Sequence, residues 1–196
     1  MSDLPDLAPN PAALEFLLTR RSRIAKTLTG PGPDRETVRT ILTAASRSPD
    51  HQKLEPWRFI VLEGEAAAAL GALTRRLGET RGRDPDRLQK DAEPFETAPL
   101  TLAVVASPKE SEKVPEVEQT LSAGGVCLAA LNATLASGWG VNWLTGWMAH
   151  DREFLTEGLA LAPHEWVAGF LHIGTPTMKP KERPRPDLDK IVDWRS

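Results

Sequence analysis

The sequence contains a single cysteine, Cys127, among its 196 residues. One thiol excludes an intramolecular disulfide and a zinc site built from several thiolates. Cys127 lies in an apolar stretch, and we expect the protein to work in a reducing, cytoplasmic environment. The sequence also lacks a large excess of either positive or negative residues, since its net charge is −3. This balance predicts no general attraction to nucleic acid or to an anionic membrane.

Long apolar runs are absent as well, and we expect no leader sequence. The longest apolar stretch, residues 121–136, is interrupted by glycine, serine, asparagine and threonine. A spanning helix needs about 20 predominantly apolar residues, so this stretch predicts a buried helix instead. Residues 1–10 are acidic and proline-rich, unlike a signal peptide or transit sequence, and we expect them to form a loose arm. Residues 11–196 are then expected to form one domain.

Several familiar catalytic motifs do not occur. The sequence has no GxGxxG after a strand, no GxxxxGK[ST] loop, no HExxH pair and no GxSxG turn. Its four histidines are scattered, and His172 falls in a predicted buried strand, where a hydrogen-bonded core histidine is expected. The residues therefore predict neither a nucleophile with its base nor a metal site.

The hydrophobic pattern predicts one sheet with helices packed on it, in an α+β or α/β arrangement. Four strands are expected, over residues 57–62, 100–106, 141–144 and 166–173. Helices are expected over residues 11–19, 34–47, 65–77, 114–137 and 151–159. Residues 75–95 predict a helical excursion that is solvated and covers an edge of the core, or that acts as a substrate lid. Residues 179–196 form a C-terminal extension whose last apolar residues are expected to dock.

Basic residues concentrate at three places, residues 20–23, 47–53 and 179–185. The first group follows a predicted helix, and it is either a solvated helix end or an anion clamp. The second lies in a polar turn that includes Pro49 and ends before Pro56, where we expect Asp50 to cap or orient the chain. Six tryptophans accompany these groups. Cations and flat apolar walls together suit a phosphate-bearing aromatic ligand, although most of the tryptophans are equally well explained as core residues.

Four motifs, taken in order, resemble the FMN-dependent nitroreductase family, and most of all its small single-domain branch. They are Arg20-Arg21-Ser22 after a short helix, Arg47-xx-Asp50-His51 before Pro-Trp and a strand, Ser122-Ala123-Gly124 on a long helix, and Trp143-x-Thr145-Gly146. The resemblance runs from about residue 11 to the end of the chain. It implies an α+β sandwich with a central, mostly antiparallel sheet flanked by helices. It also implies a homodimer with FMN sites at its interface, in which helix 114–137 forms the dimer core.

The resemblance further implies which residues hold the cofactor. Arg20, Arg21 and Ser22 would hold the phosphate, the ribityl chain or the edge of the flavin. Arg183 and Arg185 would complete the phosphate site. Arg47 and His51 would contact the flavin of the partner subunit, and Trp143, Leu144 and Thr145 would lie along the isoalloxazine. The chemistry would reside on FMN, so no protein side chain is implied as catalytic.

In function, the resemblance implies an oxidoreductase that takes hydride from NADH or NADPH. The hydride would pass through flavin N5 to an electron-poor acceptor such as a nitroaromatic or a quinone. One alternative is a flavin- or nucleotide-binding carrier or sensor that uses the same dimeric pocket without turnover. Another is a helical interaction domain that binds no flavin. The acceptor and the preference for NADH or NADPH do not follow from the sequence.

Overall fold

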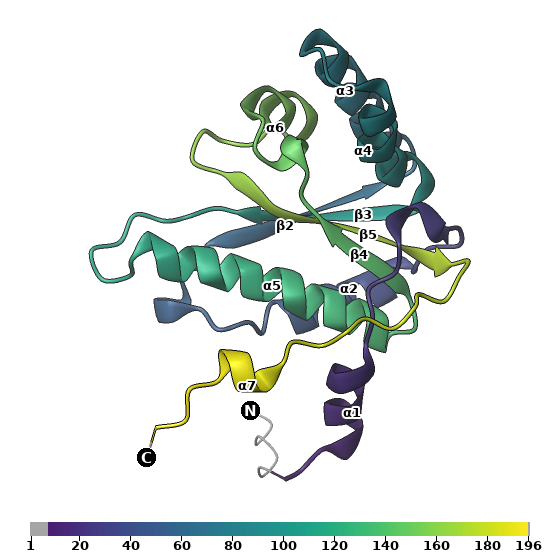
Figure 1. The fold of residues 1–196 in the computed structure, drawn as a ribbon. Helices are drawn as coiled ribbons and strands as arrows, with labels where there is room; N and C mark the ends of the chain where they lie inside the picture. Colours follow the sequence, from purple (N-terminus) through teal and green to yellow (C-terminus); the bar gives the residue numbers. More distant parts are fainter. Residues whose placement is uncertain (1–7, 196) are drawn as a thin grey trace.

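The structure is a computed structural model that describes residues 8–195, so residues 1–7 of the expected arm lie outside the described residues. A five-stranded sheet forms its middle layer, with helices on both faces (Figure 1). The strands are β1 (Leu28–Thr29), β2 (Trp57–Glu63), β3 (Leu100–Ala106), β4 (Gly140–Leu144) and β5 (Trp166–Pro176). Their order is β1-β5-β3-β2, β4 also pairs with β5, and all four pairings are antiparallel. The α+β sandwich is thus confirmed, with one strand more than the four predicted.

The helices form two layers. On one face of the sheet lie α2 (Arg35–Ala45) and α5 (Glu116–Ala136), and on the other lie α3 (Glu65–Thr80), α4 (Pro85–Thr97) and α6 (Arg152–Leu159). Three of these helices have an aspartate as the N-cap residue, namely Asp34, Asp84 and Asp151. Each carboxylate accepts a hydrogen bond from the backbone N–H of the residue three positions later in the chain. The short helices α1 (Pro11–Thr19) and α7 (Leu188–Ile191) lie beyond the α5 side, away from the sheet (Figure 1).

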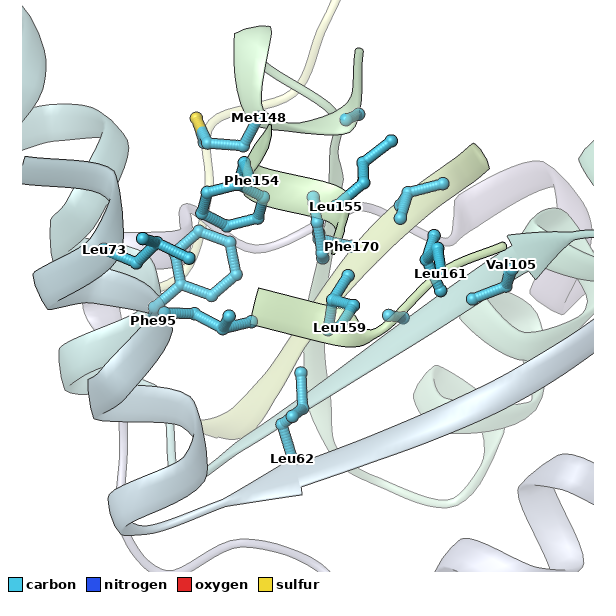
Figure 2. Packing of buried hydrophobic residues seen from close by; sticks show 14 of the residues in the cluster. Leu62, Leu73, Phe95, Val105, Met148, Phe154, Leu155, Leu159, Leu161 and Phe170 are labelled. Carbon is cyan, nitrogen blue, oxygen red and sulfur yellow. The ribbon is translucent and has the colours of Figure 1, made fainter. Parts of the chain in front are cut away.

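Each face of the sheet has its own hydrophobic cluster. Continuous apolar strands such as β3, which is buried along its whole length, supply side chains to both clusters. Toward α3, α4 and α6, the aromatic rings of Phe95, Phe154 and Phe170 pack edge to face or tilted (Figure 2). Toward α5, small side chains including Cys127 fill the space, and burial raises the pKa of the Cys127 thiol to about 12. The sheet is therefore covered on both faces, and that thiol stays protonated at neutral pH.

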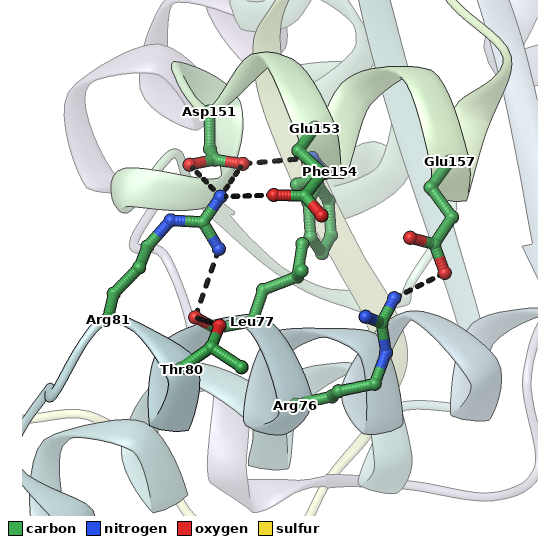
Figure 3. A network of polar contacts seen from close by, with 8 residues as sticks. All are labelled: Arg76, Leu77, Thr80, Arg81, Asp151, Glu153, Phe154 and Glu157. Atoms are coloured by element: carbon green, nitrogen blue, oxygen red, sulfur yellow. Dashed lines mark hydrogen bonds and ion pairs between the residues drawn. The ribbon is translucent and has the colours of Figure 1, made fainter.

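Residues 75–95 comprise the end of α3, a turn and most of α4. Leu88 and Ala92 of this segment are buried, so one side of α4 packs against the rest of the chain. At the end of α3, Arg81 Nη2 donates to Asp151 Oδ1 at 3.0 Å and to Glu153 Oε2 at 2.9 Å (Figure 3). These ion pairs join α3 to the start of α6.

Apolar side chains remain exposed on three helices. The largest exposed ones are Leu14, Leu17 and Leu18 on α1, Val117, Leu121 and Leu128 on α5, and Leu188 and Ile191 on α7. The docking expected for the last residues is not seen within one chain, since the side chain of Trp194 is 88 % exposed. No helix within residues 8–195 is both long enough and apolar enough to cross a membrane.

Candidate cofactor site

A cleft of about 880 Å³ lies where the segment after α1 meets the end of β4 and the C-terminal tail. Seven basic residues line it, namely Arg20, Arg21, Arg23, Lys179, Lys181, Arg183 and Arg185. Among the described residues that line it, Glu182 is the single acidic one. The structure therefore brings together the first and third basic groups of the sequence, which are about 160 residues apart in the chain. This surplus of cations makes the cleft a site for an anion.

Arg20 is the basic residue of this cleft that holds a buried donor atom without a hydrogen-bond partner. Its Nη2 donates to Ser22 Oγ at 3.3 Å, but its buried Nε has no hydrogen-bond partner among the described residues. Burial lowers the pKa of Arg20, and the nearby guanidiniums of Arg185 and Arg21 lower it further. A buried donor without an acceptor is costly, so an anion bound beside Arg20 would relieve both the missing bond and the repulsion.

The tail is fastened to this cleft through Glu182. Its Oε1 accepts from Arg21 Nη1 at 3.0 Å and lies 3.1 Å from Arg185 Nη2. Arg185 Nη2 also donates to the carbonyl oxygen of Leu18 at 3.4 Å. The N–H of Arg183, followed by the guanidiniums of Arg21 and Arg185, lowers the pKa of the Glu182 carboxyl. Arg21 and Arg185 are therefore partly neutralised, whereas Arg20 is not.

The end of β4 forms the inner wall. Arg23 N–H donates to the carbonyl of Val141 at 2.9 Å, and the Asn142 amide donates back to the carbonyl of Arg23. Sequence reasoning missed Asn142, because an asparagine in a predicted strand carries no motif of its own. Trp143 lines this cleft and also a smaller pocket on the other side of β4. Leu144 and Thr145 line only the smaller pocket.

The polar turn sits elsewhere, against α5. Asp50 accepts from the N–H groups of Leu54 at 3.2 Å and Glu55 at 2.7 Å, which confirms that it orients the turn. His51 Nδ1 lies 2.7 Å from Glu118 Oε2, and Ser122 Oγ donates to the carbonyl of Pro49 at 2.8 Å. Arg47 is exposed beside this turn and lines a separate groove.

The backbone of the turn is strained as well. Gln52, Lys53 and Glu55 all have positive φ, between 49° and 61°, although none of them is glycine. Such conformations cost energy and persist where the surroundings enforce them, often at functional sites. Here the hydrogen bonds of Asp50, and the contacts of the turn with Glu118 and Ser122 on α5, hold the backbone in this conformation.

One chain does not bring the polar turn and the basic cleft together. The turn contacts α5 at Glu118 and Ser122, whereas a groove that contains Arg20 is lined by Leu135, near the other end of α5. Ser122 and Leu135 are about 20 Å apart along a helix that rises about 1.5 Å per residue. In one chain Arg47 and His51 therefore lie near one end of α5, and Arg20 lies near the other end.

Comparison with known proteins identifies the family of this chain. The model of the nitroreductase family matches residues 17–175. The chain belongs to the nitroreductase family. It is 36 % identical over 167 residues to "Putative NAD(P)H nitroreductase YdjA" of Escherichia coli (strain K12), an alignment that covers 85 % of this chain and 90 % of that protein.

Solved structures of nitroreductases share the fold. A nitroreductase-like family protein from Bacillus cereus superposes with a TM-score of 0.75 at 20 % identity, over 96 % of this chain and 98 % of that one. A mutant of the FMN and NADPH-dependent nitroreductase NfnB from Sphigopyxis sp. strain HMH gives 0.73 at 20 % identity, over 93 % and 98 %. Members of this family are flavin-dependent oxidoreductases that use NAD(P)H, and this chain is a nitroreductase by homology. Within residues 8–195 no group of three or more His, Cys, Asp or Glu side chains could hold a metal ion.

Proposed function

We propose that this nitroreductase binds FMN and transfers hydride from NADH or NADPH to an electron-poor acceptor such as a nitroaromatic or a quinone. The observation that supports this most directly is the buried Nε of Arg20, which lacks an acceptor inside a cleft lined by seven basic residues. A phosphate monoester supplies the oxygens that such donors need. NfnB, whose fold is the same, is described as FMN and NADPH-dependent.

In this proposal each residue named from the sequence has a defined task. Arg20 and Ser22 bind the phosphate or the ribityl chain, and Arg21, Arg183 and Arg185 add positive charge around it. The end of β4, from Trp143 to Thr145, offers its backbone to the flavin ring. When bound, FMN supplies the hydride chemistry. The protein contributes position, charge and the exclusion of water, and no side chain of its own needs to act as a nucleophile.

We further propose that the active form is a homodimer. The exposed leucines of α1 and of α5 leave apolar side chains open to water in a single chain. A two-fold axis that makes two α5 helices antiparallel would place the polar turn of one copy beside the Arg20 end of the other. Arg47 and His51 would then reach the flavin from the partner subunit, although they lie near the opposite end of α5 from Arg20 within one chain.

Two measurements test this function in order. The purified full-length protein is first mixed with FMN, and an absorbance spectrum after gel filtration shows whether flavin stays bound. Anaerobic addition of NADH or NADPH should then bleach the visible absorbance of the bound flavin, because hydride transfer reduces it. Steady-state assays with nitroaromatics and quinones identify the acceptor class.

The same measurements separate the alternatives. Flavin that binds but stays oxidised with both nucleotides contradicts the reductase and favours a carrier or sensor. A protein that retains no flavin, with its cleft intact, contradicts the cofactor assignment and favours an interaction domain. The cytoplasmic location belongs to the same proposal, and the single buried cysteine is compatible with it.

A further inference from the structure

The polar turn that carries His51 is fastened to the first two turns of α5. Glu118 Oε2 lies 2.7 Å from His51 Nδ1, and Ser122 Oγ donates to the carbonyl of Pro49 at 2.8 Å. Residues four apart lie on the same face of a helix, so one face of α5 holds the turn at two points. Trp57 Nε1 donates to Ser122 Oγ at 3.1 Å and fixes that hydroxyl from a third side. The proposed function gives Glu118 and Ser122 no task.

The backbone directly after His51 is held in a costly conformation. Gln52 and Lys53 have φ of 61° and 55°, although neither is glycine. Such conformations persist where surrounding contacts enforce them. Asp50 supplies these contacts from within the turn, and Glu118 supplies one from α5. The position of the imidazole is therefore fixed both by its own turn and by the helix.

The contact between His51 and Glu118 does little for the stability of the fold. Their side chains are 51 % and 45 % exposed. Ion pairs between side chains as exposed as these contribute little or nothing measurable to the free energy of unfolding. The main effect of Glu118 is therefore on the imidazole itself, namely on its orientation and on the place of its proton.

The carboxylate determines which ring nitrogen carries the proton. An ionised carboxylate can only accept hydrogen bonds, so the contact with Glu118 requires a proton on His51 Nδ1. In the neutral ring Nε2 is then unprotonated and is a hydrogen-bond acceptor. No described residue forms a hydrogen bond with this Nε2, so it is available to a ligand.

An acceptor at this place selects one part of FMN. The ionised phosphate offers only acceptors, and in the proposed function it lies at Arg20. The flavin ring carries an N–H group, and the ribityl chain carries hydroxyls, so both can donate to a nitrogen lone pair. The free Nε2 of His51 therefore suits the ring or the ribityl chain and not the phosphate.

We infer that Glu118 is a positioning residue. It holds His51 as the Nδ1–H tautomer, so that Nε2 accepts a hydrogen bond from the ring or the ribityl chain of the flavin in the partner subunit. This inference rests on the proposed function, because it requires the homodimer and its bound flavin.

The tautomer can be measured without any flavin. The full-length protein is labelled with ¹⁵N in histidine, and the ring nitrogen shifts are recorded at pH 8, where imidazole side chains in general are neutral. His51→Ala assigns the signals among the four histidines. We expect the proton on Nδ1 of His51 in the native protein and a loss of this preference in Glu118→Ala. A proton on Nε2 in the native protein, or the same tautomer in both proteins, overturns the inference.

Glu116→Ala is the matched control. Glu116 is also exposed and also lies in the first turn of α5, so its replacement removes the same charge from the same end of the helix. It forms no ion pair with any residue of the described part of the chain and should leave the tautomer of His51 unchanged. Equal effects of the two variants would show that the charge of the helix end, and not the contact, acts on His51.

Titration with FMN and with riboflavin then measures the consequence for binding. Glu118→Ala should weaken both ligands by the same factor, about three- to tenfold, which is the value of one neutral hydrogen bond. In the His51→Ala background the same substitution should have no further effect, because Glu118 acts only through the imidazole. A loss for FMN alone would show a contact with the phosphate and contradict the acceptor role.

These outcomes separate the inference from the proposed function. If the native protein binds flavin and Glu118→Ala binds it equally well, the positioning role is wrong and the cofactor assignment stands. If the native protein binds neither FMN nor riboflavin, both are wrong, whatever the tautomer of His51. Unchanged far-ultraviolet circular dichroism and thermal unfolding in Glu118→Ala show that its effects are not those of a damaged fold.

Discussion

Arg58 and Glu165 form a bidentate ion pair, in which Arg58 Nε donates to Glu165 Oε1 at 2.7 Å and Arg58 Nη2 donates to Glu165 Oε2 at 2.8 Å. Arg58 lies on β2, and Glu165 directly precedes β5, so the pair spans β3, which lies between those strands. Glu165 Oε2 also accepts the N–H of Ala162 at 3.0 Å. The bonds from Arg58, and to a lesser degree that from Ala162, lower the pKa of Glu165 to about 2. The side chain of Glu165 is 8 % exposed, so its charge depends on these partners.

Replacing this carboxylate should destabilise the fold. Glu165→Gln keeps the shape but removes the charge that meets Arg58, and we expect a loss of about 1 to 2 kcal/mol in the free energy of unfolding, since Arg58 is itself partly exposed. Urea unfolding at pH 7 measures the change. The matched control is Glu157→Gln, which breaks an ion pair with Arg76 whose side chains are both about half exposed, and should cost less than about 0.5 kcal/mol. Equal losses for the two variants would show that burial adds nothing to the Arg58 pair.

The buried imidazole of His172 makes the free energy of unfolding depend on pH in a range above that in which Glu165 contributes. Its pKa is about 3 in the fold and about 6.5 when unfolded, so the unfolded chain binds one more proton between these values. Stability should therefore fall as the pH drops below 6.5, by about 1.4 kcal/mol per pH unit. Glu165 contributes only below its unfolded value of about 4.5.

Unfolding measurements at pH 7, 6 and 5 isolate the contribution of His172. His172→Gln has no proton to take up at this position and should flatten the slope in this range, even if the variant is less stable throughout. A slope that is the same in both proteins would contradict a buried neutral His172.

The sequence predicts most of the sheet because three of its strands are continuous apolar runs. β3 is buried at every position, and its predicted bounds, residues 100–106, are those of the structure. β1 was missed because two residues, Leu28 and Thr29, carry no periodic signal, and only their pairing with Thr175 and Pro176 makes them a strand. α4 could not be distinguished as a separate helix because charged residues dominate its sequence and Pro94 lies inside it.

The candidate site shows the same limit. Arg20, Arg21 and Ser22 are adjacent in the sequence, so local spacing was enough to single them out. Their meeting with Arg183 and Arg185 is a tertiary contact made through Glu182, which no local pattern reveals. His172 was expected to be a hydrogen-bonded core residue, and its bond to Thr101 is as expected. His172 also lines a pocket together with residues of α4 and of the end of β4, which only the tertiary structure brings together.

The proposed dimer predicts that a charge on the exposed stripe of α5 will keep the chains apart. Leu128 is 48 % exposed in the single chain, and Leu128→Glu would bury a carboxylate in the interface, which is costly without a partner. Sedimentation or light scattering should show a dimer for the native protein and a monomer for the variant. Ala69→Glu is the control, because Ala69 is exposed on α3, on the opposite side of the sheet. A native protein that is monomeric at micromolar concentrations would refute the dimer.

The cofactor assignment predicts unequal effects for two adjacent arginines. Arg20 has a buried Nε without an acceptor, whereas Arg21 already binds Glu182 at 3.0 Å. A charge-assisted hydrogen bond is worth roughly 1.5 to 3 kcal/mol, so Arg20→Ala should raise the dissociation constant of FMN by more than about tenfold. Arg21→Ala should cost less, because Glu182 already neutralises part of the charge of Arg21.

Fluorescence titration of the FMN-free protein with FMN and with riboflavin measures this difference. Riboflavin lacks the phosphate, so its affinity should change little in either variant if the arginines bind phosphate. Arg76→Ala serves as the control, because Arg76 pairs with Glu157 on the far side of the sheet, and it should leave both affinities unchanged. If Arg20→Ala weakens FMN and riboflavin equally, Arg20 contacts the flavin ring and not the phosphate. An unchanged FMN affinity in the Arg20→Ala, Arg21→Ala double variant would exclude this cleft as the phosphate site.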